Sequence, residues 1–115
     1  MAMGAYSECT DFLVGCCYHG SMLIQSVHYT FAAEDADKVE AILRELRDAS
    51  RKEEGVTTFD VGRSRDEPNV FALWEEYRDQ AALDAHFASD HFKRLVINGI
   101  RPLAKRRDFT MVVPI

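Results

Sequence analysis

Four stretches of the chain alternate apolar and polar residues, the pattern of a strand with one buried face. In the first, Val27, Tyr29 and Phe31 share a face, while His28 lies on the other. The third brings the carboxylate of Glu75 onto an otherwise apolar face. This pattern predicts strands over residues 23–31, 56–64, 70–77 and 108–113.

Apolar residues recur at helical spacing in two further regions. The first helix is expected to begin with Asp35 or Asp37 as its cap and to run to about Lys52. Gly55 follows as its C-terminal signal. The second region lies between the third and fourth predicted strands and is expected to hold two helices in succession.

Capping residues divide this second region. Asp79 is placed to cap a helix whose inward stripe carries His86, and Asp90 to cap a helix that begins with His91. Pro102 should kink or end the later helix, because proline removes a backbone donor and clashes with the preceding turn.

The resulting order, βαββαβ, predicts an α+β ferredoxin-like plait, a four-stranded antiparallel sheet with both helices on one face. Because Met22 directly precedes the first strand, we expect this domain to span residues 22–115, with 1–21 as an N-terminal extension. Strands one and four carry apolar residues on both faces, so the uncovered face should pack against a second copy. The prediction is a homodimer, a dimeric α+β barrel.

Composition and charge narrow the functional classes. The chain has 115 residues and a net charge of -5, which argues against nucleic-acid binding. It has no apolar run of membrane-spanning length and no signal-peptide pattern, so we expect no membrane association. Its three cysteines show neither zinc-ligand spacing nor a disulfide framework. We therefore predict no metal site and a cytoplasmic location.

Three segments, in this order, resemble the antibiotic biosynthesis monooxygenase (ABM) domain family. Residues 53–61 hold an acidic-Glu-Gly turn, 71–79 an aromatic-Glu strand end, and 81–93 a His followed by Ser-x-His-Phe. The resemblance covers roughly residues 22–113 and implies a dimeric α+β barrel. Family members include cofactor-free quinol or anthrone monooxygenases, haem-degrading enzymes and an isomerase of a phosphorylated autoinducer, so the fold alone does not name the reaction.

The haem-degrading branch is not implied. Where that branch has Asn, Trp and His, this chain has Val27 (approximately), Tyr77 and Val96. None of these side chains can ligate iron as the branch's histidine does. We therefore expect no haem, and no other cofactor.

Four residues are candidate catalytic groups. A carboxylate on the apolar face at Glu75 is costly unless paired, and His86 could supply the partner. His91 lies in the first turn of its helix, where the dipole favours a neutral, proton-accepting imidazole. Tyr77 could donate to a developing anion. The alternative is structural: a core histidine, an ion pair that locks helix to sheet, and a core aromatic.

Further aromatic and polar residues are candidates for contact with the substrate. Because Trp74 and Tyr77 point to opposite faces of one strand, at most one of them lines a given pocket. Packing in the core, or exposure to water, is the alternative for each residue. The predicted substrate-binding residues are Trp74, Phe87, Phe92, Asp60 and His28.

The favoured function is a cofactor-independent monooxygenase that oxidises a small aromatic quinol, phenol or anthrone with O2. A histidine base removes the phenolic proton, and the electron-rich anion then reduces O2 without metal or flavin. Two alternatives stay open. One is an isomerase of a phosphorylated autoinducer-type metabolite, with Lys93, Arg94 or the helix start at Asp90 binding the phosphate. The other is a non-catalytic dimeric small-molecule-binding protein.

Overall fold

The computed structural model of the protein describes residues 21–115, so the predicted extension lies almost entirely outside the described residues. Short 3-10 turns at Ala33–Asp35 and Arg101–Leu103 flank the helices. The last long helix, Phe92–Ile100, is a π-helix. The other elements are β2 (Leu23–Thr30), α1 (Ala36–Ser50), β3 (Val56–Arg63), β4 (Val70–Tyr77), α2 (Gln80–Ala88) and β5 (Arg106–Val112).

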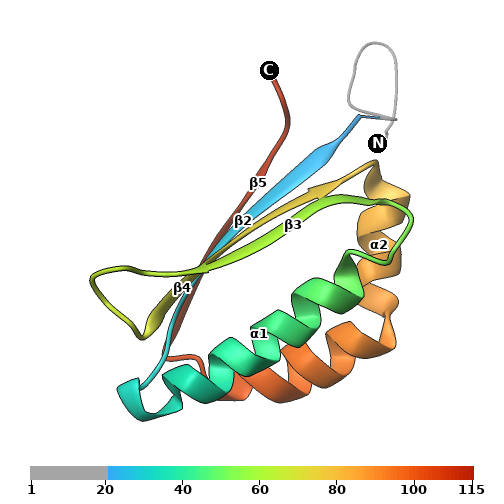
Figure 1. Cartoon of the computed structure of the whole chain (residues 1–115). Coiled ribbons are helices and arrows are strands. Elements are labelled where there is room, and N and C mark those ends of the chain that lie inside the picture. Colours follow the sequence, from blue (N-terminus) through green and yellow to red (C-terminus); the bar gives the residue numbers. More distant parts are fainter. Residues whose placement is uncertain (1–20) are drawn as a thin grey trace.

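The strands form one four-stranded sheet in the order β3-β4-β2-β5, and every neighbouring pair is antiparallel. Figure 1 shows α1, α2 and the π-helix together on one side of this sheet. This arrangement confirms the predicted α+β ferredoxin-like fold. No helix within residues 21–115 combines the length and apolar character needed to cross a bilayer.

The side chains that face the helices form rows across the sheet. Successive rows lie two residues apart along each strand, because alternate side chains point to the same face. From one end of β2 to the other, the rows are Glu75–Gln25–Met111, Leu73–Val27–Phe109 and Phe71–Tyr29–Arg107.

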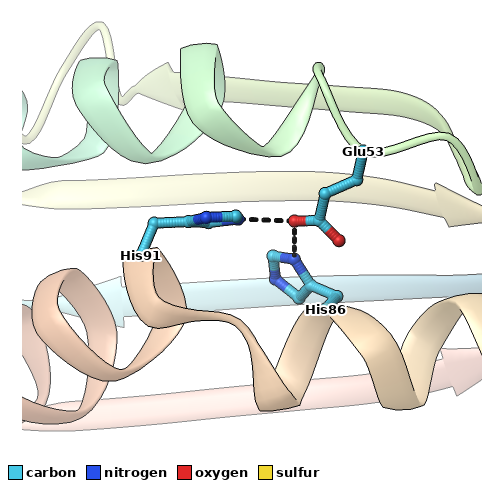
Figure 2. Close-up of side chains that lie close together, drawn as sticks. All are labelled: Glu53, His86 and His91. Carbon is cyan, nitrogen blue, oxygen red and sulfur yellow. Dashed lines mark hydrogen bonds and ion pairs between the residues drawn. The ribbon is translucent and has the colours of Figure 1, made fainter.

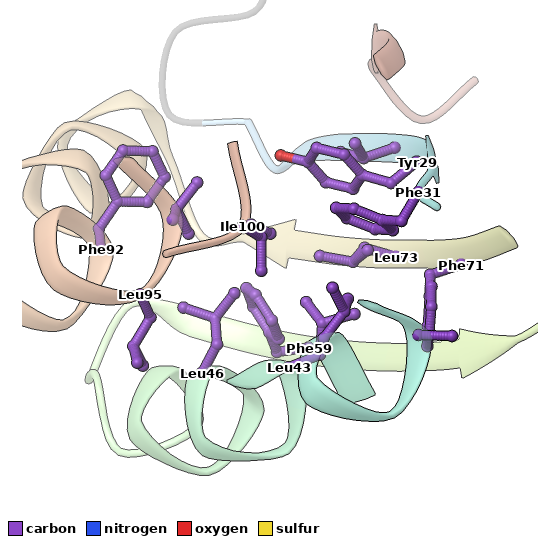
Figure 3. Close-up of a cluster of buried hydrophobic side chains, with 14 residues drawn as sticks. Tyr29, Phe31, Leu43, Leu46, Phe59, Phe71, Leu73, Phe92, Leu95 and Ile100 are labelled. Carbon is purple, nitrogen blue, oxygen red and sulfur yellow. The ribbon is translucent and has the colours of Figure 1, made fainter. Parts of the chain in front are cut away.

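Aromatic and aliphatic side chains from these rows pack against the helices to form the core (Figure 3). Phe31 just after β2 and Phe59 of β3 are almost completely buried, as are Leu43 of α1 and Ile100 at the end of the π-helix. Burial of side chains this large is the main favourable term that holds helices on the sheet.

Helix capping agrees with the sequence at one site and differs at another. The Asp79 carboxylate accepts from the Ala82 backbone N–H at 2.9 Å, so the predicted cap of α2 is confirmed. The predicted cap at Asp90 is wrong, because Asp90 already lies within a helical turn. Instead the Ser89 hydroxyl accepts from the Phe92 backbone N–H at 3.2 Å. A serine hydroxyl satisfies a helix start as well as a carboxylate does.

The sheet face without helices differs from the prediction. It was expected to be apolar, but Trp74 is its only large hydrophobic side chain that is exposed among the described residues. The exposed Phe109 and Met111 of β5 lie on the opposite, helix-facing side. The face without helices is mainly polar and carries Ser26, His28, Thr30, Thr58, Asp60, Glu76, Asp108 and Thr110. The apolar-face argument for a homodimer therefore fails, and the homodimer stays a prediction.

Gly55 has a packing role instead of the predicted helix-ending one, because α1 ends five residues earlier, at Ser50. A Cβ at Gly55 would lie 2.3 Å from the Ala82 Cβ of α2, well inside van der Waals contact. We expect Gly55→Ala to lower the free energy of unfolding by about 1–3 kcal/mol, the usual cost of overpacking, in urea denaturation.

Gly62→Ala is the matched control, since a Cβ there would meet nothing within 4 Å. Its free energy of unfolding should stay within about 0.5 kcal/mol of the parent value. Equal losses in the two variants would show that contact with α2 does not require glycine at Gly55.

Candidate active site

A cavity of about 470 Å³ lies between the helix-facing side of the sheet and the segment formed by α2 and the π-helix. Its volume is within the range of small-molecule sites. Part of the cavity wall is aromatic and consists of Phe87 and Phe92 from the helical segment and Phe109 from β5. The polar groups at this wall come from Gln25, Tyr29, Glu75, Gln80, His86, Arg101 and Arg107.

Glu75 places a buried carboxyl group at the cavity. Its side chain is only 3% exposed, and burial raises its pKa to about 7. The Tyr77 hydroxyl donates to Glu75 Oε1 at 2.5 Å, and Gln25 Nε2 donates to the same oxygen at 3.3 Å. Burial and the adjacent carboxylate raise the pKa of Tyr77, so its hydroxyl remains a donor. The Glu75 group therefore changes its protonation state near neutral pH.

A second polar cluster joins the turn after α1 to the start of the π-helix (Figure 2). Glu53 Oε2 lies 2.9 Å from His86 Nδ1 and 2.5 Å from His91 Nε2. His86 is 1% exposed and lines the cavity, whereas Glu53 and His91 are half-buried and do not line it. The cluster therefore runs from the cavity wall at His86 toward the surface.

The His86 ring is held among aromatic rings. Those of Phe59, Tyr77, Phe87 and Phe92 all have centroids within 6.0 Å of it. Burial lowers the pKa of His86, and its contact with Glu53 opposes that change. A neutral imidazole whose Nδ1–H donates to a carboxylate keeps Nε2 as an acceptor, which is the form that a general base requires.

The structure replaces the predicted partner of His86. No hydrogen bond or ion pair joins His86 to Glu75 in the described chain, and Glu53 takes the place expected for Glu75. Glu53 was not predicted as a site residue, although it opens the first segment that resembles the ABM family. Glu53 lies in the turn after α1, close in sequence to Gly55, which packs against α2. This packing brings the turn near His86 of α2, and it is the feature that could have connected the two residues.

The predicted site residues fall into three groups. Glu75, His86, Phe87 and Phe92 line the cavity. Tyr77 and His91 lie behind this wall, where they contact Glu75 and Glu53 respectively. Trp74, Asp60 and His28 line a different hollow of about 330 Å³ on the face without helices, so they do not share the cavity of His86.

The Glu53–His86–His91 cluster also has the donor set of a metal site. One oxygen and two nitrogens lie within 4.8 Å of one another, and two imidazoles with a carboxylate suit divalent transition metals. This cluster was not foreseen from the sequence. In this structure the same atoms are joined to one another by hydrogen bonds, with Glu53 Oε2 shared between the two imidazoles. At the haem-branch positions, Val27 and Val96 line the cavity with apolar side chains.

Comparison with known proteins agrees with this geometry. The family model described as antibiotic biosynthesis monooxygenase matches residues 22–96. The chain belongs to this family. The match includes Glu53, Glu75, His86 and His91, the groups at and behind the cavity wall. No curated protein matches the chain.

Solved structures of this family's fold span the whole domain. A protein of Pseudomonas aeruginosa is 28% identical, with a TM-score of 0.76 over 83% of this chain and 95% of its own. A structure described as an antibiotic biosynthesis monooxygenase is 31% identical, with a TM-score of 0.71 over 81% and 96%. A conserved protein of Bacteroides thetaiotaomicron, described as a possible oxidoreductase, is 25% identical, with a TM-score of 0.77 over 83% and 99%.

Proposed function

We propose that this ABM-family protein is a cofactor-independent monooxygenase that oxidises a small electron-rich phenol, quinol or anthrone with O2. One observation carries the proposal: His86, held by Glu53 at Nδ1, is set into the wall of an aromatic-lined cavity that also contains Glu75. A buried, oriented base beside an aromatic pocket is suited to deprotonation of a phenol. Family membership supports the same reaction class.

In this mechanism the His86 imidazole accepts the acidic proton of the substrate. Glu53 holds the ring and stabilises the imidazolium that forms, as the carboxylate of a histidine–carboxylate pair does. The substrate anion then supplies the electrons for O2. In an anthrone-type substrate the methylene carbon loses four electrons and becomes a carbonyl. One atom of O2 enters that carbonyl and the other leaves as water, so no external reductant is required.

His91 and Tyr77 have positioning roles in this proposal. His91 Nε2 contacts the same oxygen of Glu53 from the surface side, so it holds that carboxylate in place beside His86. Tyr77 holds the Glu75 carboxyl group at the far end of the cavity wall. The homodimer remains part of the proposal on the family resemblance, and the cytoplasmic location on the cysteine pattern.

Oxygen consumption by the purified protein tests the function. We expect O2 uptake with a naphthohydroquinone or an anthrone at a rate well above their autoxidation, with unchanged rates after treatment with a chelator. Added flavin or Fe(II) should not raise the rate. Heat-denatured protein at the same concentration controls for autoxidation. Uptake only after a metal or flavin is added, or none with any substrate of this class, would reject the proposal.

The structure offers less support for the isomerase alternative. Lys93 and Arg94, the predicted phosphate ligands, are exposed and do not line the cavity. Arg94 instead pairs with Glu45 of α1 at 2.8 Å. A non-catalytic binding protein would show saturable binding of aromatic compounds with no O2 uptake.

A further inference from the structure

Two arginines line the cavity, and Arg107 lies along the sheet away from Glu75. Arg101 follows the π-helix, and Arg107 is on β5 directly opposite Tyr29 of β2. Each guanidinium rests on an aromatic face: Arg101 is 5.6 Å from the centroid of Phe92, and Arg107 is 4.6 Å from that of Phe109. Stacking of this kind holds a guanidinium in place and leaves its N–H donors free for a ligand.

These two arginines differ from the others in their partners. Within residues 21–115, neither Arg101 nor Arg107 forms an ion pair with a described carboxylate, although both are cations in a protein of net charge -5. The arginines that do pair with a described carboxylate are Arg44, Arg47, Arg51, Arg63, Arg65, Arg78, Arg94 and Arg106.

The Tyr29 hydroxyl belongs to the same end of the cavity. Burial raises the pKa of Tyr29, and the nearby Arg101 and Arg107 cations oppose that rise. The tyrosine is 3% exposed and lines the cavity. One hydroxyl and two guanidinium groups therefore converge on one region of the wall.

The register of the sheet sets the spacing between the two polar ends. Glu75 is in the row of Gln25, and Arg107 is in the row of Tyr29, four residues further along β2. Four residues of strand span about 13 Å. Between these rows lie Val27 and the exposed ring of Phe109. The cavity therefore has a carboxyl end, an apolar middle and a guanidinium end.

We propose that this cavity binds aromatic compounds that carry an anionic group, a carboxylate or a phosphate or sulfate ester, with that group held by Arg101 and Arg107. The aromatic ring occupies the apolar middle, and a phenolic oxygen lies toward His86 and Glu75. The orientation of the phenol rests on the proposed function, but binding of the anionic group does not. Guanidinium groups match the planar, multidentate geometry of carboxylate and phosphate oxygens.

Binding of redox-inert probes tests the proposal without turnover. The probes are 2-naphthoate, 2-naphthyl phosphate and the uncharged 2-naphthamide, measured by calorimetry with the full chain. We expect at least one anion to bind about 10-fold or more tightly than the amide, the size of a charge-assisted hydrogen bond. The tighter of the two anions identifies the preferred group. Anions that bind no better than the amide, or show no measurable binding, would overturn the proposal.

Substitution of the two arginines tests whether they cause the preference for anions. Arg101→Gln and Arg107→Gln should each weaken anion binding about 10-fold and leave the affinity for the amide unchanged. Arg106→Gln is the matched control, because its side chain lies on the other face of β5 and pairs with Asp108 at 2.7 Å. Circular dichroism checks that each variant is folded, and Arg107→Lys should retain part of the preference. Equal losses in Arg106→Gln would place the effect outside the cavity.

The outcomes also separate this proposal from the proposed function. Preference for the anions without O2 uptake from any quinol would keep the anion site and reject the monooxygenase. Uptake of O2 with no preference for anions would keep the monooxygenase and reject the anion site.

Discussion

Replacing His86 with glutamine should lower kcat/KM for oxidation of a quinol or anthrone by about 10²–10⁴-fold, the usual contribution of a positioned general base. His86 lines the cavity, is 1% exposed, and is held at Nδ1 by Glu53. Glutamine fills much of the same space but cannot accept and hold a proton. The initial rate of O2 consumption, with autoxidation subtracted, measures the effect.

Two further variants test whether the loss is catalytic. His28→Gln, on the sheet face without helices, should leave kcat/KM unchanged, because His28 does not line this cavity. Glu53→Gln should cause a smaller loss than His86→Gln. It should also move the acid limb of the kcat/KM profile to lower pH, because the Glu53 carboxylate raises the pKa of His86. An unchanged acid limb would mean that Glu53 has only a structural role.

The elements were predictable from the sequence because their signals are local. Alternation along β2 and β4 reports which side chains are buried, and Asp79 caps α2 through a bond to a residue three positions away. At the π-helix, two adjacent candidates, Ser89 and Asp90, compete for one role. Ser89 has extended backbone whereas Asp90 is already helical, and composition does not report this difference.

The site was predictable only in part because its contacts join distant segments. His86 and Glu75 were foreseen as polar groups on apolar faces, and both line the cavity. Their predicted pairing with each other is wrong, because the carboxylate that reaches His86 is that of Glu53, 33 residues away, in the turn before β3. Arg101 and Arg107 were not predicted as site residues, because only the sheet register places Arg107 beside Tyr29. Residue type thus predicts which buried polar groups need partners, whereas the fold determines which partners they have.

Glu75→Gln should change the pH dependence of stability. The pKa of Glu75 is raised by burial from 4.5 to about 7, so the folded protein keeps this proton where the unfolded chain has lost it. Unfolding therefore releases a proton between pH 4.5 and about 7, and the parent protein loses stability as the pH rises through that window. Glutamine resembles the protonated carboxyl group and does not ionise. The free energy of unfolding of the variant, relative to the parent, should therefore rise by about 3 kcal/mol between pH 4 and pH 8.

Urea denaturation at several pH values measures this difference, and comparison between variants removes the contribution of His86. Burial lowers the pKa of His86, so its contribution to stability increases with pH, but it is common to both proteins and cancels. Glu40→Gln is the control, because the pKa of Glu40 is shifted in the opposite direction to that of Glu75. Arg44 and Arg63 lower the pKa of Glu40, so its contribution is lost only below pH 4.5, and its difference from the parent should be flat between pH 5 and 8. If the Glu75→Gln difference were also flat there, Glu75 would be ionised throughout, and the cavity wall would carry a fixed negative charge instead of a group that titrates near neutral pH.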